Sequence, residues 1–137
     1  MKRLSKFFVG VLLTATAVFA ALFFYSCGKS ADGVEPVVIV ADESAGGKTL
    51  LAVMEEMEAA GELSYKVKDG MIVGINGTEN DIDYDPCWML YTSDAENSST
   101  AWGEYDYEGQ ILGSANYGAE SLLVKAGEIY VWVYQEF

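Results

Sequence analysis

The sequence predicts an α+β domain, and three observations support this fold class. Residues 37–41 (Val-Val-Ile-Val-Ala) form a continuous run rich in β-branched side chains, which is typical of a buried strand. Apolar residues at helical spacing follow between Leu50 and Met57. An alternating segment then leads into Asp69-Gly70, a dipeptide favoured in two-residue hairpin turns. This order predicts a sheet that packs on one main helix.

The first strand and the helix are the first two predicted elements. Because residues 37–41 show no polar alternation, we expect this strand to be covered on both faces and to be central in its sheet. Glutamates lie between the apolar residues of the helix, so the helix is expected to be amphipathic. Thr49 is its expected N-cap, and Gly61 is the expected residue just past its end.

The remaining predicted elements are strands. Residues 63–68 alternate in polarity and form the first arm of the predicted hairpin, and residues 71–75 form the second. Further strands are expected at residues 87–92 and 128–137. In the last of these, three aromatic side chains alternate with three aliphatic ones, which favours a central strand buried on both faces. Trp and Tyr have polar tips that suit half-exposed surfaces, so we expect some of these rings to line a binding surface.

The N-terminus has the pattern of a bacterial lipoprotein leader. Three basic residues precede an uncharged run, residues 7–26, and the small residue Ser26 stands directly before Cys27. We therefore expect cleavage before Cys27 and lipidation of its thiol. The uncharged run is also near the ~20 residues that a spanning helix needs, so an uncut N-terminal anchor is the alternative. Either interpretation places the rest of the chain outside the cytoplasm.

Three segments follow from this interpretation. Residues 1–27 are the predicted signal peptide, residues 28–36 a flexible tether, and residues 37–137 one folded domain. The expected location is the outer face of the bacterial cytoplasmic membrane, with membrane contact through the N-terminal lipid only.

The chain that follows the leader is strongly acidic. It carries five lysines against 21 acidic residues, a net charge of −16. Such a field repels nucleic acid and anionic lipid head groups, so a nucleic-acid partner is excluded. High solubility outside the cell is the simplest consequence of this charge, and attraction of a cationic ligand or of divalent ions is the alternative.

The composition also argues against an enzyme. The sequence contains no His, and its only Arg is Arg3 in the leader, so the usual near-neutral proton shuttle and the bidentate anion ligand are both missing. Once Cys27 is lipidated, Cys87 is the single remaining thiol, and we expect it to be buried and structural. We predict no catalytic residues, no metal site and no cofactor.

Two motifs are interpreted as structural. Residues 46–49 (Gly-Gly-Lys-Thr) lie between a strand and a helix, but the first glycine of a phosphate-binding loop would fall at Asp42. Asp81, Asp83 and Asp85 have the spacing of a calcium loop, yet the sixth position of that loop is Pro86 instead of Gly. A solvated acidic loop is expected here, and weak calcium binding stays open.

The order of motifs resembles the bacterial DUF4430 domain, which is similar to the C-terminal domain of transcobalamin and intrinsic factor. The resemblance covers residues 37–137 and rests on five segments, which are residues 48–54, 65–67, 73–77, 88–91 and 124–132. It implies a β-grasp-like mixed sheet that grips one helix. It also implies a flat, apolar ligand such as cobalamin or another corrinoid, although the helical domain that completes the vitamin site in those relatives has no counterpart in this sequence.

Four aromatic residues are the candidate ligand contacts. Trp88 and Tyr91 lie on the strand that carries the resemblance, and Trp102 and Tyr117 lie in segments expected to be long loops. Stacking rings suit a corrinoid or another flat aromatic or sugar-like ligand. For Trp88, core packing is an equal alternative. The alternative function is cell-surface adhesion without a small ligand, with a transporter or another surface protein as the partner.

Overall fold

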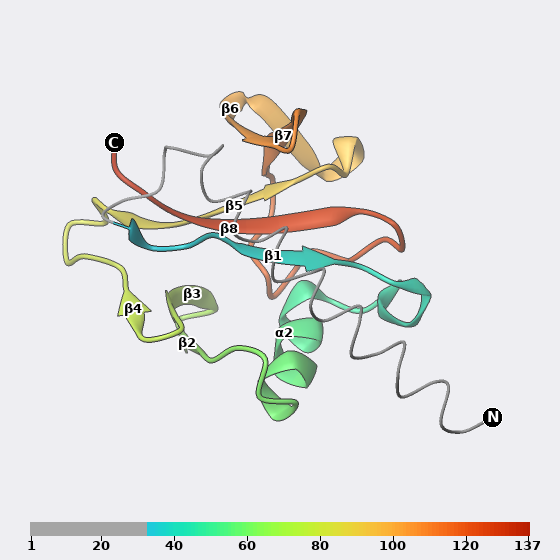
Figure 1. Ribbon diagram of the computed structural model, residues 1–137, viewed down its shortest axis with the longest axis horizontal. Coiled ribbons are helices and arrows are strands. Elements are labelled where there is room, and N and C mark those ends of the chain that lie inside the picture. Colours follow the sequence, from blue (N-terminus) through green and yellow to red (C-terminus); the bar gives the residue numbers. More distant parts are fainter. Residues whose placement is uncertain (1–32) are drawn as a thin grey trace.

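Residues 33–137 are described by a computed structural model, and they form two antiparallel sheets and one α-helix (Figure 1). The predicted leader with Cys27, and residues 28–32 of the predicted tether, lie outside the described residues. In chain order the elements are β1 (Val37–Val40), η2 (Glu43–Ala45), α2 (Leu50–Ala59), β2 (Tyr65–Lys68), β3 (Met71–Ile75), β4 (Thr78–Glu79), β5 (Cys87–Thr92), η3 (Ala95–Asn97), β6 (Ser98–Tyr107), β7 (Gln110–Ala115) and β8 (Ile129–Gln135). The predicted order of strand, helix and strands is confirmed.

The larger sheet has the strand order β1-β8-β5-β7-β6. The C-terminal strand β8 lies between β1 and β5, and its inner residues are buried on both faces, as the alternating pattern predicts. The predicted central position of residues 37–41 is wrong, because β1 is an edge strand. It is only four residues long, it pairs with β8 on one side, and the Val40 side chain is 63% exposed.

The expected mixed sheet is also corrected by the structure. Every pairing between the described strands is antiparallel. The larger sheet has no parallel pair among these strands because the helix that follows β1 does not lead into a neighbouring strand of the same sheet. The chain passes instead into the separate sheet β2-β3-β4 and re-enters the larger sheet as β5.

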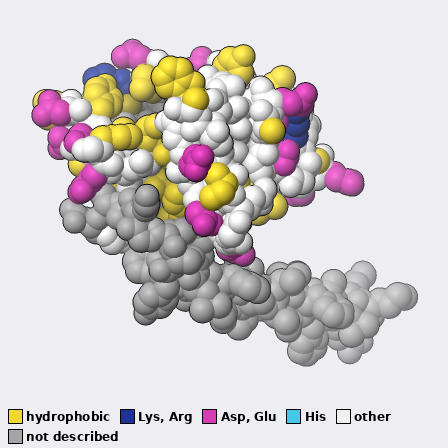
Figure 2. Space-filling view, turned by 90° about the horizontal axis from the view of Figure 1, so that it is seen from above, with side chains coloured by type: hydrophobic (Ala, Val, Ile, Leu, Met, Phe, Trp, Pro, Cys, Tyr) yellow, Lys and Arg dark blue, Asp and Glu magenta, His cyan; other side chains and the backbone are white. Residues whose placement is uncertain are grey.

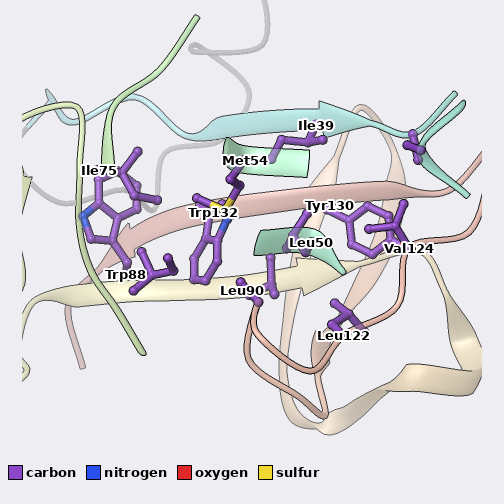
Figure 3. Close-up of a cluster of buried hydrophobic side chains, with 14 of the residues drawn as sticks. Ile39, Leu50, Met54, Ile75, Trp88, Leu90, Leu122, Val124, Tyr130 and Trp132 are labelled. Atoms are coloured by element: carbon purple, nitrogen blue, oxygen red, sulfur yellow. The ribbon is translucent and has the colours of Figure 1, made fainter. Parts of the chain in front are cut away.

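Two apolar cores lie on opposite faces of the larger sheet. Figure 1 shows α2 and the small sheet below β1, β8 and β5, and the β6–β7 hairpin above them. The main core lies on the α2 side and contains the aromatic face of β8, namely Tyr130, Trp132 and Tyr134. Figure 3 shows Tyr130 and Trp132 in this core. The second core lies on the other side and contains Val131 and Val133 from the aliphatic face.

The helix α2 begins and ends as its sequence predicts. The Thr49 hydroxyl accepts a hydrogen bond from the Ala52 N–H (3.1 Å), which satisfies an N–H that has no partner within the helix. At the other end Gly61 adopts φ +77°, and the Glu62 N–H bonds back to the Met57 carbonyl (2.9 Å), which is a Schellman motif. Leu50 is fully buried, and burial of such a side chain contributes about 1.5–3 kcal/mol.

The predicted β2–β3 hairpin is confirmed. Asp69 (φ 52°) and Gly70 (φ 77°) both have positive φ, as a two-residue type I′ turn requires. β2 begins at Tyr65, two residues later than expected, although Leu63 is buried.

The β6–β7 hairpin is an element that the sequence analysis missed. Its turn, Glu108-Gly109, has the same pair of positive φ angles (50° and 86°) as Asp69-Gly70. Trp102 therefore lies in a strand and not in a long loop, which corrects that expectation.

The domain's contacts begin before β1, because Val34, in the predicted tether, packs against the main core. Among residues 33–137, no helix has the length and apolar character needed to cross a bilayer.

Candidate functional site

Trp88 occupies the main core and is 6% exposed. Its indole N–H donates to the Thr78 carbonyl (2.8 Å), and its backbone N–H donates to Asn80 Oδ1 (2.8 Å). The ring packs against Tyr134 with a centroid distance of 5.2 Å. These hydrogen bonds connect β5 to β4 and the residue after it, and they satisfy the indole N–H. Trp88 is thus a core residue, as the alternative of core packing predicts.

Tyr91 is 2% exposed and lies in the second core, on the opposite face of the sheet from Trp88. Its hydroxyl donates to Gln135 Oε1 (2.6 Å), and its ring stacks on Tyr105 with a centroid distance of 5.6 Å. Burial raises the pKa of Tyr91, and the hydrogen bond to Gln135 offsets part of that rise. Tyr91 therefore supports the sheet and stays protonated at neutral pH.

Trp102 is 78% exposed on β6, the edge strand of the larger sheet. The register of β6 against β7 shifts between Ser99 and Glu104, so Trp102 lies on an irregular segment of the strand. Gly103 adopts φ +141°, and a Cβ there would lie 3.5 Å from the Tyr91 hydroxyl. The buried Tyr91 thus lies beneath the backbone of the segment that presents Trp102 to solvent.

Tyr117 is 54% exposed in the connection between β7 and β8. The preceding residue is fixed, because the Asn116 N–H donates to the Asn97 carbonyl (2.8 Å) next to the start of β6. Tyr117 is therefore an exposed ring on a connection tied to the β6–β7 hairpin.

The structure does not bring the four predicted contacts together. Trp88 and Tyr91 are buried in different cores, whereas Trp102 and Tyr117 are exposed. The expectation that all four rings share one surface is wrong for Trp88 and Tyr91. Strand alternation directs these two rings to opposite faces of the sheet, and each packs in the core on its own face. Trp102 on β6 and Tyr117 on the connection after β7 remain exposed, and these two side chains are hereafter called the aromatic surface.

Two grooves in the described part of the chain are lined by residues other than Trp102 and Tyr117. The larger, about 430 Å³, lies between β1, η2 and α2. The smaller, about 160 Å³, lies over β2 and β3 and is lined by residues that include Tyr65 and Glu79. The larger groove was missed in the sequence because it depends on β1 being an edge strand.

Acidic side chains are spread over the surface. Figure 2 shows the molecule from the side of the β6–β7 hairpin, where acidic side chains lie at many places among hydrophobic ones. Among the described residues, the acidic side chain of Asp94 is buried. It accepts hydrogen bonds from the Asn97 amide (2.8 Å), the Glu96 N–H (3.1 Å) and Lys125 Nζ (3.2 Å). Burial opposes ionisation, but these donors together hold the pKa of Asp94 below its usual range.

The acidic loop after β4 makes contacts within itself and with the C-terminal residue Phe137. The Asp83 N–H approaches Asp81 Oδ2 (3.4 Å), and Asp85 Oδ1 accepts from the Phe137 N–H (2.9 Å). Within residues 33–137, no three metal-binding side chains converge on one point. Cys87 is buried beside this loop, and burial first and the Asp85 charge second raise the pKa of its thiol.

The fold and these surfaces define an acidic α+β domain with an exposed aromatic surface and a groove beside an edge strand. No family model, curated protein or solved structure matches this chain.

Proposed function

We propose that this chain is a non-catalytic binding module, tethered through lipidated Cys27 to the outer face of the bacterial cytoplasmic membrane, that binds a protein partner at its aromatic surface. The observation that carries the proposal is the exposure of Trp102, a large side chain that the folded strand β6 holds in solvent. Trp is the residue most often found at the energetic centre of protein interfaces, and Tyr is also enriched there.

For the fold, we propose the finer class of a β-grasp-like DUF4430 domain. Support comes from the single main helix packed on one face of a sheet and from the positions of the resembling segments. Residues 88–91 fall in β5, and residues 73–77 cover the end of β3 and the turn that follows it. The antiparallel pairing would make this chain a variant of the mixed-sheet form.

A protein partner is favoured over a small ligand by the exposure of the aromatic surface. A small molecule is held in a concave site that buries most of its surface. Trp102 and Tyr117 line neither of the two grooves described above, so neither groove would place a small ligand against these rings. Protein interfaces often use exposed aromatic side chains as anchors.

A corrinoid or another flat ligand is the second candidate, and it is favoured by the same two rings together with the resemblance. Such a ligand would stack on one side only and would need a second protein to cover its other side. Titration with cobalamin, followed by tryptophan fluorescence, distinguishes the candidates. A saturable change that is lost in Trp102→Ala supports the corrinoid, whereas no response favours the protein partner.

A non-catalytic role fits the chemistry of the chain. The sequence has no His, and the raised pKa of Cys87 keeps that thiol protonated and a poor nucleophile at neutral pH.

The protein-partner proposal is tested by affinity purification of the tagged full chain from the cells that carry it, after detergent solubilisation. We expect specific proteins that are lost from the double variant Trp102→Ala/Tyr117→Ala. Ile82→Ser is the matched control, because Ile82 is 88% exposed but lies in the acidic loop. If the double variant and the control retain the same proteins as the native chain, the aromatic surface is not the binding site.

The tether is tested by mass analysis of the mature protein from membranes. A chain that begins at a diacylglyceryl-modified Cys27 supports lipid anchoring. A chain that begins at Met1 without lipid supports the uncut anchor.

A further inference from the structure

The outer edge of β1 offers main-chain hydrogen-bonding groups. β1 ends the strand order, so among the described residues it pairs only with β8. Ala41 donates to the Glu128 carbonyl (3.0 Å) and accepts from the Gly127 N–H (2.8 Å). Because these groups alternate in direction along an antiparallel strand, Val38 and Val40 direct their N–H and C=O groups away from β8. The edge therefore has the donors and acceptors that an added strand requires.

β1 is short, but its edge lacks the other features that normally block strand addition. Edge strands of natural proteins are usually interrupted by charges, prolines or bulges. The four residues of β1 are all apolar and β-branched, and their register with β8 is regular. Pro36 and Asp42 flank the strand on either side, so the open edge is confined to β1 itself.

A groove with both apolar and polar lining lies beside the same edge. It has a volume of about 430 Å³, and Val38, Ile39 and Val40 of β1 line it together with Val53 and Met57 of α2. Figure 3 shows Ile39 directed from β1 toward the helix, where Met54 lies beneath it. Alternate side chains of a strand point to the same face, so every second side chain of a segment paired with β1 would be directed toward α2.

The rim of the groove carries negative charge. Asp42, Glu56 and Glu62 line it. A hydrogen bond from the Ser44 hydroxyl (2.6 Å), followed by one from the Ala45 N–H (3.0 Å), lowers the pKa of Asp42, so this carboxylate stays ionised. Lys48 pairs with Glu56 (2.6 Å), and its charge also acts on Asp42. One cation thus faces three carboxylates, so the rim stays negative and attracts a cationic partner.

We propose that the β1 edge and the adjoining groove bind a basic, extended segment of another protein, which adds to the larger sheet as a sixth strand beside β1. Main-chain hydrogen bonds to Val38 and Val40 supply the pairing, apolar side chains of the segment enter the groove, and its lysines or arginines face Asp42 and Glu62. A second copy of this chain is disfavoured, because each copy carries a net charge of −16 beyond the leader. This site is separate from the aromatic surface and does not depend on it.

The test uses the full chain in detergent and a short, capped, fluorescent peptide with a valine-rich centre and lysines at both ends, with binding followed by anisotropy. Val40→Pro removes an outward N–H on an edge position that tolerates proline, and we expect binding about tenfold weaker, the equivalent of one hydrogen bond. Val40→Thr keeps the N–H and the branched shape, so it should bind like the native chain.

Charge and peptide variants separate the other contributions. Asp42→Asn/Glu62→Gln should weaken binding about fivefold at low salt, and the matched pair Asp83→Asn/Glu104→Gln, which removes the same charge elsewhere, should have a much smaller effect. A peptide with glutamate in place of lysine should not bind. A peptide N-methylated at alternate amides should also fail, which tests the strand pairing without changing the protein.

Three results would overturn the proposal. The first is equal binding of the native chain, Val40→Pro and the N-methylated peptide. The second is an equal loss from the two charge pairs. The third is slow hydrogen exchange at the Val38 and Val40 amides without peptide, because the edge would then already be covered by this chain or by another copy.

Discussion

Trp88 and Trp102 are the same residue type in adjacent parts of one sheet, yet their surroundings assign them different roles. Trp88 uses both of its N–H groups in hydrogen bonds and fills the main core, whereas Trp102 extends into solvent. Trp88→Ala should reduce the free energy of unfolding by about 3–5 kcal/mol, because it leaves a large cavity. Trp102→Ala should change it by less than about 0.5 kcal/mol, and urea unfolding of both variants measures the difference. Equal destabilisation would contradict the assignment of Trp102 to a binding role alone.

Asp94 is the residue whose ionisation should make stability depend on pH. Its pKa is lower in the folded protein than in the unfolded chain, so its contribution is complete above the unfolded value and is lost as the pH falls through the folded value. Asp94→Asn should therefore be less stable than the native chain at neutral pH, by about 1–2 kcal/mol. The gap should close as the pH falls below about 4. A gap that stays constant in urea unfolding between neutral pH and pH ~2 would contradict this role.

Among the elements, the β6–β7 hairpin depends on a turn that only certain residues adopt. Gly109 has φ +86° with no neighbour near its absent side chain, so Gly109→Ala tests backbone strain alone. We expect a loss of about 1–2 kcal/mol in the free energy of unfolding. Gly118→Ala is the control, since Gly118 has no positive φ and its absent side chain also has open space around it. The same small effect from both variants would show that the turn tolerates an ordinary residue.

Local signals in the sequence predict the elements better than their arrangement. Thr49, Gly61 and the pair Asp69-Gly70 act through neighbouring backbone groups, so the helix and the β2–β3 hairpin follow from the chain itself. The edge position of β1 does not, because it depends on β8, which lies about 90 residues further along the chain. The β6–β7 hairpin was missed because its turn, Glu108-Gly109, is a less typical pair than Asp-Gly.

Only the exposed part of the candidate site could be predicted, because the buried part depends on contacts with distant strands. Exposed rings among small polar residues identify Trp102 and Tyr117, whose surroundings are local. The burial of Trp88 and Tyr91 is set by Tyr134, Tyr105 and Gln135, which come from other strands. The strand alternation of β5 also separates the two rings, since residues three apart point to opposite faces.

At the scale of the whole molecule, the net charge should limit stability. Residues 28–137 carry a net charge of −16, which repels itself in the folded state, and salt screens this repulsion. Added NaCl up to ~0.3 M should therefore raise the free energy of unfolding in urea, and KCl should have the same effect. A decrease with salt would mean that the few ion pairs, such as Lys66 with Glu79, outweigh the repulsion.

The central claim is that the aromatic surface contacts a protein partner outside the cytoplasm. Site-specific photocrosslinking in intact cells tests it most directly, with a photoreactive amino acid in place of Trp102 and, in a second strain, in place of the equally accessible Ile82. The account predicts a discrete protein adduct from position 102 that is absent from position 82. No adduct at position 102, or the same adducts from both positions, would contradict it.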